Sequence, residues 1–206
     1  MSDYKSPYAA NIGRMNNSEV VSLAKNRFTD EETQIAIAKH HYALARQYLA
    51  ENPDVSEAAA DILWNRKGYV LKCALLLNGK KELSDEEMTQ FYRTTFKNRK
   101  SRKWRMHQAF LGGYGWRSSN NNSKTPGVLL EEIYADTVKN EDDPQYHLVR
   151  RFVEHPNCTL DLALRISTMK IPEGQFRWGL RRWEEVKHLA LMKVAEITKR
   201  EGAISR

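Results

Sequence analysis

Residues 45–63 read ARQYLAENPDVSEAAADIL, and residues 149–167 read VRRFVEHPNCTLDLALRIS. Each stretch contains an apolar helical segment, a polar residue, a proline, a capping residue and a second apolar helical segment. Proline suits the position after the first segment because it cannot continue the preceding helix. Both stretches therefore predict the same unit, a pair of short helices joined by a tight turn.

Regularly spaced asparagines extend this unit toward the N-terminus. Three of them, each at the end of a leucine-containing segment, lie 26 residues apart: Asn26, Asn52 and Asn78. A helix-start signal follows each one, namely TDEE at 29–32, SE at 56–57 and SDEE at 84–87. In such a signal the hydroxyl accepts from one unpaired backbone N–H and the glutamate accepts from another. A fixed interval of this kind indicates a helical repeat.

The two stretches resemble the variant leucine-rich repeat, a HEAT-like helical repeat that typically reads Val-Arg-x-x-Ala-Ala-x-Asn-Pro, then a cap and Leu-x-x-Leu. The likeness covers about half of the chain. It implies an all-α fold, a short α-solenoid in which stacked two-helix repeats share one core. The third copy departs from the pattern with Asn78-Gly79 in place of Asn-Pro, and residues 93–145 match no copy. The alternative is an irregular helical bundle whose Asn-Pro turns coincide by chance.

We expect a single helical-repeat domain over residues 1–206 with a basic, Gly/Asn-rich insertion at 93–126. Within the insertion, the basic segment up to Met106 is predicted to be helical, and residues 112–126 form a loop expected to be mobile. A helix is predicted over 128–138, and a long final helix over about 175–199. The expected core stripe of that last helix is Leu180, Trp183, Val186, Ala190, Val194 and Ile197.

Composition favours an ordinary soluble protein, since 41% of the residues are hydrophobic and 29% are charged. No apolar run approaches the roughly 20 residues that a membrane helix needs, and residues 1–8 lack the apolar core of a signal peptide. Cys73 and Cys158 lie far apart and form no CxxC motif. We therefore expect two reduced, mostly buried thiols in a cytoplasmic protein, with one disulfide as the alternative.

Motifs for catalysis, metals and cofactors are missing from the sequence. The six histidines (40, 41, 107, 147, 155 and 188) form no HExxH or HxxxH pattern, and neither a P-loop nor GxSxG occurs. Neither cysteine has the setting of a nucleophile. We expect no metal, no cofactor and no catalytic residue, which favours a binding protein over an enzyme.

Positive charge is concentrated in one segment. The formal net charge is +7, from 33 Lys/Arg and 26 Asp/Glu. Residues 93–124 contain nine Lys/Arg and no Asp/Glu, which leaves 24 basic and 26 acidic residues in the rest of the chain. The excess is therefore local, and a local excess makes a patch.

This basic segment also carries aromatic rings, a mixture that favours nucleic acid. Cations release counterions from phosphates, and a flat ring stacks on a base for roughly 1–3 kcal/mol. The candidate binding residues are Lys97, Arg99, Lys100, Arg102, Lys103, Trp104, Arg105, Trp116 and Arg117. A second candidate group lies one helical turn apart on the final helix: Arg177, Trp178, Arg181 and Arg182. The structural alternative is a solvated basic helix anchored by Trp104 and Phe110, with arginine stems packed on the final helix.

Three functions follow from these patterns. The first is a non-catalytic protein that binds nucleic acid, either RNA or DNA. The alternative is a protein–protein interaction adaptor or assembly component, as helical solenoids commonly are. The third is a DNA glycosylase built from HEAT-like repeats, which the chain resembles only in its helices, positive charge and tryptophans. No catalytic carboxylate can be assigned for it, since Asp136 and Asp142 are merely acidic residues downstream of the basic segment.

Overall fold

The computed structural model describes residues 6–97, 109–111, 124–140, 146–171 and 177–204. All regular elements in these ranges are helices and none is a strand, which confirms the all-α prediction. The chain divides into two compact units, Met1–Ser84 with Trp104–Asn122, and Asp85–Lys103 with Ser123–Arg206. Most of the proposed insertion at 93–126 falls outside the described residues, so its boundaries stay a prediction.

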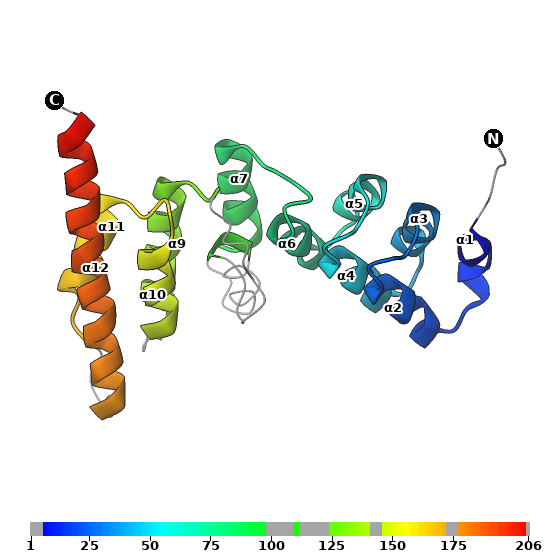
Figure 1. Ribbon diagram of the computed structural model, residues 1–206, viewed down its shortest axis with the longest axis horizontal. Helices are drawn as coiled ribbons and strands as arrows, with labels where there is room; N and C mark the ends of the chain where they lie inside the picture. The colour runs from blue at the N-terminus through cyan, green and yellow to red at the C-terminus, as the bar shows by residue number, and fades with distance from the viewer. Residues whose placement is uncertain (1–5, 98–108, 112–123, 141–145, 172–176, 205–206) are drawn as a thin grey trace. The chain divides into compact units, whose positions relative to one another are not determined.

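Unit 1 consists of short helices that pack alternately. They are α1 (Pro7–Asn11), the 3-10 helix η1 (Ile12–Arg14), α2 (Asn17–Lys25), α3 (Glu31–Lys39), α4 (Ala43–Glu51), α5 (Glu57–Trp64) and α6 (Tyr69–Leu77). Helix α4 packs between α2 and α6, and α3 packs against α5. Figure 1 shows α2, α4 and α6 in one row and α3 and α5 in another. Helices two apart in sequence are therefore neighbours.

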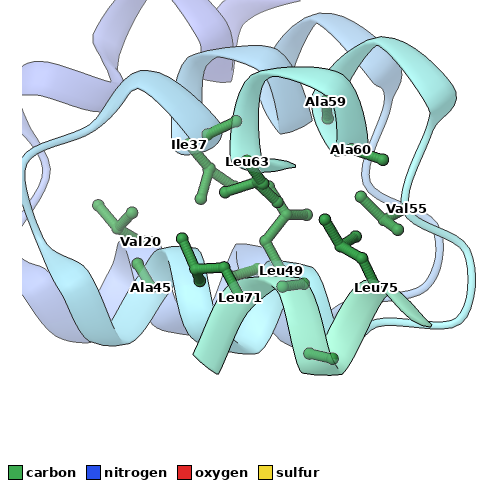
Figure 2. Close-up of a cluster of buried hydrophobic side chains, with 14 of the residues drawn as sticks. Val20, Ile37, Ala45, Leu49, Val55, Ala59, Ala60, Leu63, Leu71 and Leu75 are labelled. Atoms are coloured by element: carbon green, nitrogen blue, oxygen red, sulfur yellow. The ribbon is translucent and has the colours of Figure 1, made fainter. Parts of the chain in front are cut away.

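Aliphatic side chains from both rows fill the space between them. Figure 2 shows Ile37 of α3 and Leu63 of α5 in the same cluster as Leu49 of α4 and Leu71 of α6. Leu49 and Leu63 are fully buried, and burial of one such side chain is worth about 1.5–3 kcal/mol. Alanines line the close contacts between helices, among them Ala45, Ala59 and Ala60. Each helix pair thus depends on its neighbours for a closed core.

The asparagines at the 26-residue interval form a hydrogen-bond ladder. Nδ2 of Asn52 donates to the carbonyl oxygens of Ala24 and Asn26, at 3.1 Å each. Nδ2 of Asn78 donates to Ala50 and Asn52 in the same way, at 2.7 and 3.3 Å. The last carbonyls of a helix have no partner within it, so each asparagine satisfies the end of the helix two elements earlier. The spacing seen in the sequence therefore has a physical cause.

Two of the predicted helix caps are confirmed and one is wrong. Ser56 and Thr159 cap their helices as predicted, since each hydroxyl accepts from a backbone N–H three residues later. The cap of α3 is Asp30, not Thr29: the Asp30 carboxylate accepts from Thr33 N, while Thr29 donates to Leu23 O. Aspartate is the better cap of the two, and it lies directly before the first helical residue, Glu31.

Unit 2 is organised around a long helix at the C-terminus. Its helices are α7 (Asp85–Thr95), α9 (Gly127–Asn140), α10 (Tyr146–Glu154), α11 (Leu160–Thr168) and α12 (Arg177–Ile204). Helix α12 packs against both α10 and α11. Buried aliphatic and aromatic residues from α10 and α11 include Leu148, Phe152, Leu162 and Ile166.

The predicted core stripe of α12 is partly wrong. Trp183, Val186 and Ala190 are buried, whereas Leu180 is 40% exposed. Val194 and Ile197 are half-buried. Successive residues on a helix differ by about 100°, and Leu180 falls to the side of the line through the three buried residues. The buried position in that turn is Gly179 instead.

The turn at 155–159 reproduces the asparagine turns with a different residue. Nδ1 of His155 accepts from the backbone N of Asn157 over 3.1 Å. Oδ1 of Asn52 accepts from Asp54 N in the equivalent way, over 3.0 Å. Both residues precede a proline, so a histidine here occupies the position of the asparagine. Cys158 in this turn and Cys73 in α6 are buried thiols that form no disulfide, as predicted.

Candidate nucleic-acid interface

Lys97, the first residue of the candidate site, lies just after α7 and is ion-paired. Its Nζ is 2.8 Å from Oε1 of Glu132 in α9. Arg93, one turn earlier, donates from Nη2 to the other oxygen of Glu132 over 2.9 Å. Hydrogen bonds from Arg93 and then from Lys97 outweigh partial burial and lower the pKa of Glu132. One carboxylate therefore offsets part of the positive charge at the start of the basic segment.

The central part of the candidate site lies outside the described residues. This applies to Arg99, Lys100, Arg102, Lys103, Trp104, Arg105, Trp116 and Arg117. The short described piece between them, residues 109–111, is helical and buried, and Phe110 is fully enclosed. Phe110 thus has the core position that the structural alternative gives it.

The second candidate group lies at the start of α12, with its arginines in solvent. The side chain of Arg181 is 84% exposed, and Arg182 is also exposed. Both approach Glu185, at 3.5 and 3.0 Å, so two guanidinium groups share one carboxylate. Arg177 is exposed, while the side chain of Trp178 lies outside the described part. The first turn of α12 contains no acidic residue, so the positive end of the helix dipole adds to these charges.

Sequence reasoning missed a further group of cations in unit 1, at the end of α3. Arg66 donates from Nε to Ala38 O over 3.0 Å and from Nη2 to Lys39 O over 2.8 Å. Arg46 donates from Nη1 to the next carbonyl oxygen, that of His40. The signal in the sequence was present, since His40 and Arg66 are 26 residues apart. These residues were overlooked because they are scattered along the chain.

Asp136, one of the two carboxylates considered for a glycosylase, has a structural partner. Its Oδ2 accepts from the hydroxyl of Tyr92 over 2.9 Å. Burial and then the hydrogen bond to Asp136 raise the pKa of Tyr92, so the phenol stays protonated and keeps donating. Asp142, the other carboxylate, lies outside the described residues.

The described residues contain neither a metal-binding cluster nor a membrane-spanning helix. Across these ranges, no group of three or more His, Cys, Asp or Glu side chains is arranged to hold a metal ion. None of the helices in the same ranges combines the length and the apolar content needed to cross a bilayer.

Comparisons with known proteins give no match, whether with protein-family models, with curated proteins or with solved structures. The likeness to the variant leucine-rich repeat therefore rests on the segments at 45–63 and 149–167 alone. What the protein does is inferred from its own residues.

Proposed function

We propose that this chain binds nucleic acid, RNA or DNA, without catalysing a reaction, through basic and aromatic residues on a HEAT-like α-solenoid. One observation carries the proposal: residues 93–124 contain nine Lys/Arg and no Asp/Glu, in a chain that is otherwise slightly acidic. Such a segment concentrates positive potential where phosphates release their counterions. Trp104 and Trp116 add flat rings for base stacking.

The helix arrangement of unit 1 supports the solenoid part of the proposal. Alternate helices are neighbours there, and asparagines connect their ends at a constant 26-residue interval. Repeats that each contact only the next one generate a stack with an extended surface. A surface of this kind suits a long, regularly charged ligand better than a compact one.

Ion pairs with Glu132 reduce the contribution of two basic residues to the proposed interface. Lys97 and Arg93 share Glu132, so they contribute less to phosphate binding than unpaired cations would. The proposed contacts are therefore made mainly by Arg99–Arg105, together with Arg117. Arg177, Arg181 and Arg182 on α12 form a second, weaker group.

Fluorescence anisotropy with a short labelled oligonucleotide tests the proposal. We expect micromolar or tighter binding at low salt, with an affinity that falls steeply as salt increases. Replacement of four residues with serine (Lys100, Arg102, Lys103 and Arg105) is expected to abolish binding. Unchanged affinity in that variant would reject the assignment.

A matched pair of double variants controls for net charge. Lys100→Ser with Lys103→Ser removes two charges from the basic segment. Lys170→Ser with Lys199→Ser removes two charges from exposed positions in unit 2 that lie outside both candidate groups. The first pair is expected to weaken binding far more than the second, since only the first removes proposed phosphate contacts.

A protein-binding role is the second candidate, and exposed apolar side chains favour it. Phe28, in the turn after α2, is 95% exposed, and Leu191 and Met192 are more than half exposed on α12. Apolar and aromatic side chains in solvent are typical of contact surfaces for proteins. This role would replace the first if the protein binds neither RNA nor DNA at low salt and a pull-down recovers a specific partner that Phe28→Ser releases.

A further inference from the structure

The carboxyl end of α3 carries two guanidinium groups on three successive backbone carbonyls. Arg66, which follows α5, donates to Ala38 O and Lys39 O, and Arg46 of α4 donates to His40 O. Both arginines come from later helices and converge on one helix end. Lys39, His41 and Lys67 are exposed next to them in sequence.

The acidic residues that the structure describes do not pair with these charges. Among the described residues, Lys39, Arg46, Arg66 and Lys67 form no ion pair with an acidic side chain. Burial and then the nearby charge of Arg66 lower the pKa of Arg46, which places the two guanidinium groups within electrostatic range. The dipole of α3 supplies only about half a negative charge at this end. The positive charge of these side chains therefore exceeds the negative end of the helix dipole.

The contacts to α3 use only some of the N–H donors of the two arginines. A guanidinium has five N–H donors, of which Arg66 uses two and Arg46 uses one in these contacts. The backbone bonds hold each fork in a fixed orientation, so little side-chain entropy is lost when an oxyanion binds. Nε of Arg46 is buried and has no hydrogen-bond partner. The Arg46 side chain as a whole is half-buried.

We propose that Lys39, His41, Arg46, Arg66 and Lys67, the α3-end cluster, bind a phosphate group. The unused N–H donors of the two arginines can bind phosphate oxygens, and the exposed lysines add attraction. The inference rests on the proposed function for its ligand, since a nucleic-acid backbone is the source of phosphate that we favour. Free phosphate is the other source.

The 26-residue repeat indicates how the protein would follow a nucleic-acid strand. Arg14, His40 and Arg66 lie 26 residues apart, at the junctions η1–α2, α3–α4 and α5–α6. The hydrogen bonds of Asn52 hold the far ends of α2 and α4 together, so their near ends form one edge. Arg14 and Arg66 therefore lie on the same edge two repeats apart, whereas His40 between them is buried with a lowered pKa and adds no cation at neutral pH.

Two titrations of the full chain, labelled with 15N and followed by NMR, test the α3-end cluster. One uses inorganic phosphate, with chloride at equal ionic strength as the control, and the other uses a short oligonucleotide. Saturable shifts of the amide signals of residues 39–41 and 66–67 are expected in both. The charge-reversal variant Lys39→Glu with Lys67→Glu leaves the arginine contacts to α3 in place. It is expected to reduce the slope of log K against log salt for the oligonucleotide by about 1–2, while Lys170→Glu with Lys199→Glu does not.

The two titrations separate the possible failures. If neither phosphate nor the oligonucleotide moves these signals, the inference is overturned, even if the protein binds nucleic acid elsewhere. If phosphate moves them and no oligonucleotide binds, the cluster is a site for free phosphate and the proposed function fails. If both move them and the charge reversal lowers the slope, the nucleic-acid backbone is the ligand.

Discussion

The side-chain amide of Asn78 donates to the backbone carbonyl oxygen of Asn52, 26 residues earlier in the chain. Asn52 donates in turn to the carbonyl oxygen of Asn26. Each asparagine also reaches the carbonyl of an alanine in the last turn of the helix that its own helix packs against. Three helix ends are thereby tied in series, and these ties set the register between neighbouring helix pairs.

Replacement of Asn52 with alanine is expected to destabilise the protein by about 2–4 kcal/mol. The change leaves the carbonyls of Ala24 and Asn26 without their side-chain donor, and a buried unsatisfied group costs about 1–3 kcal/mol. Urea unfolding measures the loss. Asn65→Ala is the control, because Asn65 is exposed and its side chain makes no hydrogen bond among the described residues; we expect a change within about 0.5 kcal/mol there. Equal effects of the two substitutions would contradict the ladder.

Replacement of His40 with asparagine is expected to flatten the dependence of stability on pH. Burial, followed by the charges of His41 and Arg46, lowers the pKa of His40, and its Nδ1 accepts from Tyr42 N over 3.2 Å. The unfolded chain takes up this proton near pH 6.5 and the folded chain only at lower pH, so stability falls as the pH drops below about 6.5. Asparagine keeps the acceptor, as in the turns at Asn26 and Asn52, and does not titrate. Thermal melts between about pH 7.5 and pH 5 measure the slope; an unchanged slope would mean that other groups set it.

Replacement of Gly127 with alanine is expected to cost about 1–3 kcal/mol, because the first turn of α9 has no space for a methyl group. A Cβ there would lie 2.6 Å from Cγ2 of Thr159 and 3.0 Å from the backbone oxygen of Asn157. Gly202→Ala is the matched control, since a Cβ at that helical position meets nothing within 4 Å. The control is expected to gain up to about 1 kcal/mol from helix propensity. Chemical denaturation of both variants should give opposite signs, and the same sign in both would refute the contact.

Replacement of Glu132 with glutamine is expected to strengthen nucleic-acid binding. The change frees Lys97 and Arg93 from their shared carboxylate, so the slope of log K against log salt should become steeper by about 1–2. Glu154→Gln alters the net charge equally and releases only Arg150, on α10. Anisotropy titrations at several salt concentrations compare the two variants. Equal slopes would remove Lys97 from the binding site.

Both cysteines are expected to react slowly with a thiol reagent while the protein is folded. Burial raises the pKa of Cys158 to about 11, so at pH 8 only about one thiol in a thousand is ionised. Cys73 is buried as well. Addition of denaturant should expose two reactive thiols, which a colorimetric assay counts. Rapid reaction of either thiol in the native protein would contradict its burial.

Much of the local structure was predictable from the sequence, because local signals have local causes. Pro53 and Pro156 follow the ends of α4 and α10 because proline cannot continue a preceding helix, and Ser56 and Thr159 cap helices through their own hydroxyls. The choice of Asp30 over Thr29 as a cap was not predictable, because both residues are good caps and a shift of one residue decides between them. The exposure of Leu180 was missed for a similar reason, since it depends on the rotation of α12 against α10 and α11.

The candidate site, too, was predictable from the sequence only in part. Composition located the positive charge at 93–124, since a count of charges needs no coordinates. The pairing of Lys97 with Glu132 was invisible because the partners are 35 residues apart. The convergence of Arg46 and Arg66 on the end of α3 was hidden for the same reason, because the fold brings together three segments that are separate in the chain.

By itself, the sequence determined that this protein is helical, where most helices begin and end, and that its asparagines recur every 26 residues. These properties depend on backbone preferences and on neighbours within one turn of helix. Only the tertiary structure showed that the 26-residue interval brings each asparagine side chain to the carbonyls at the end of a neighbouring helix. It also decided which cations lie in solvent and which pair with a carboxylate. Hydrogen bonds and ion pairs between distant residues depend on packing, and packing is set by the whole chain rather than by any one segment.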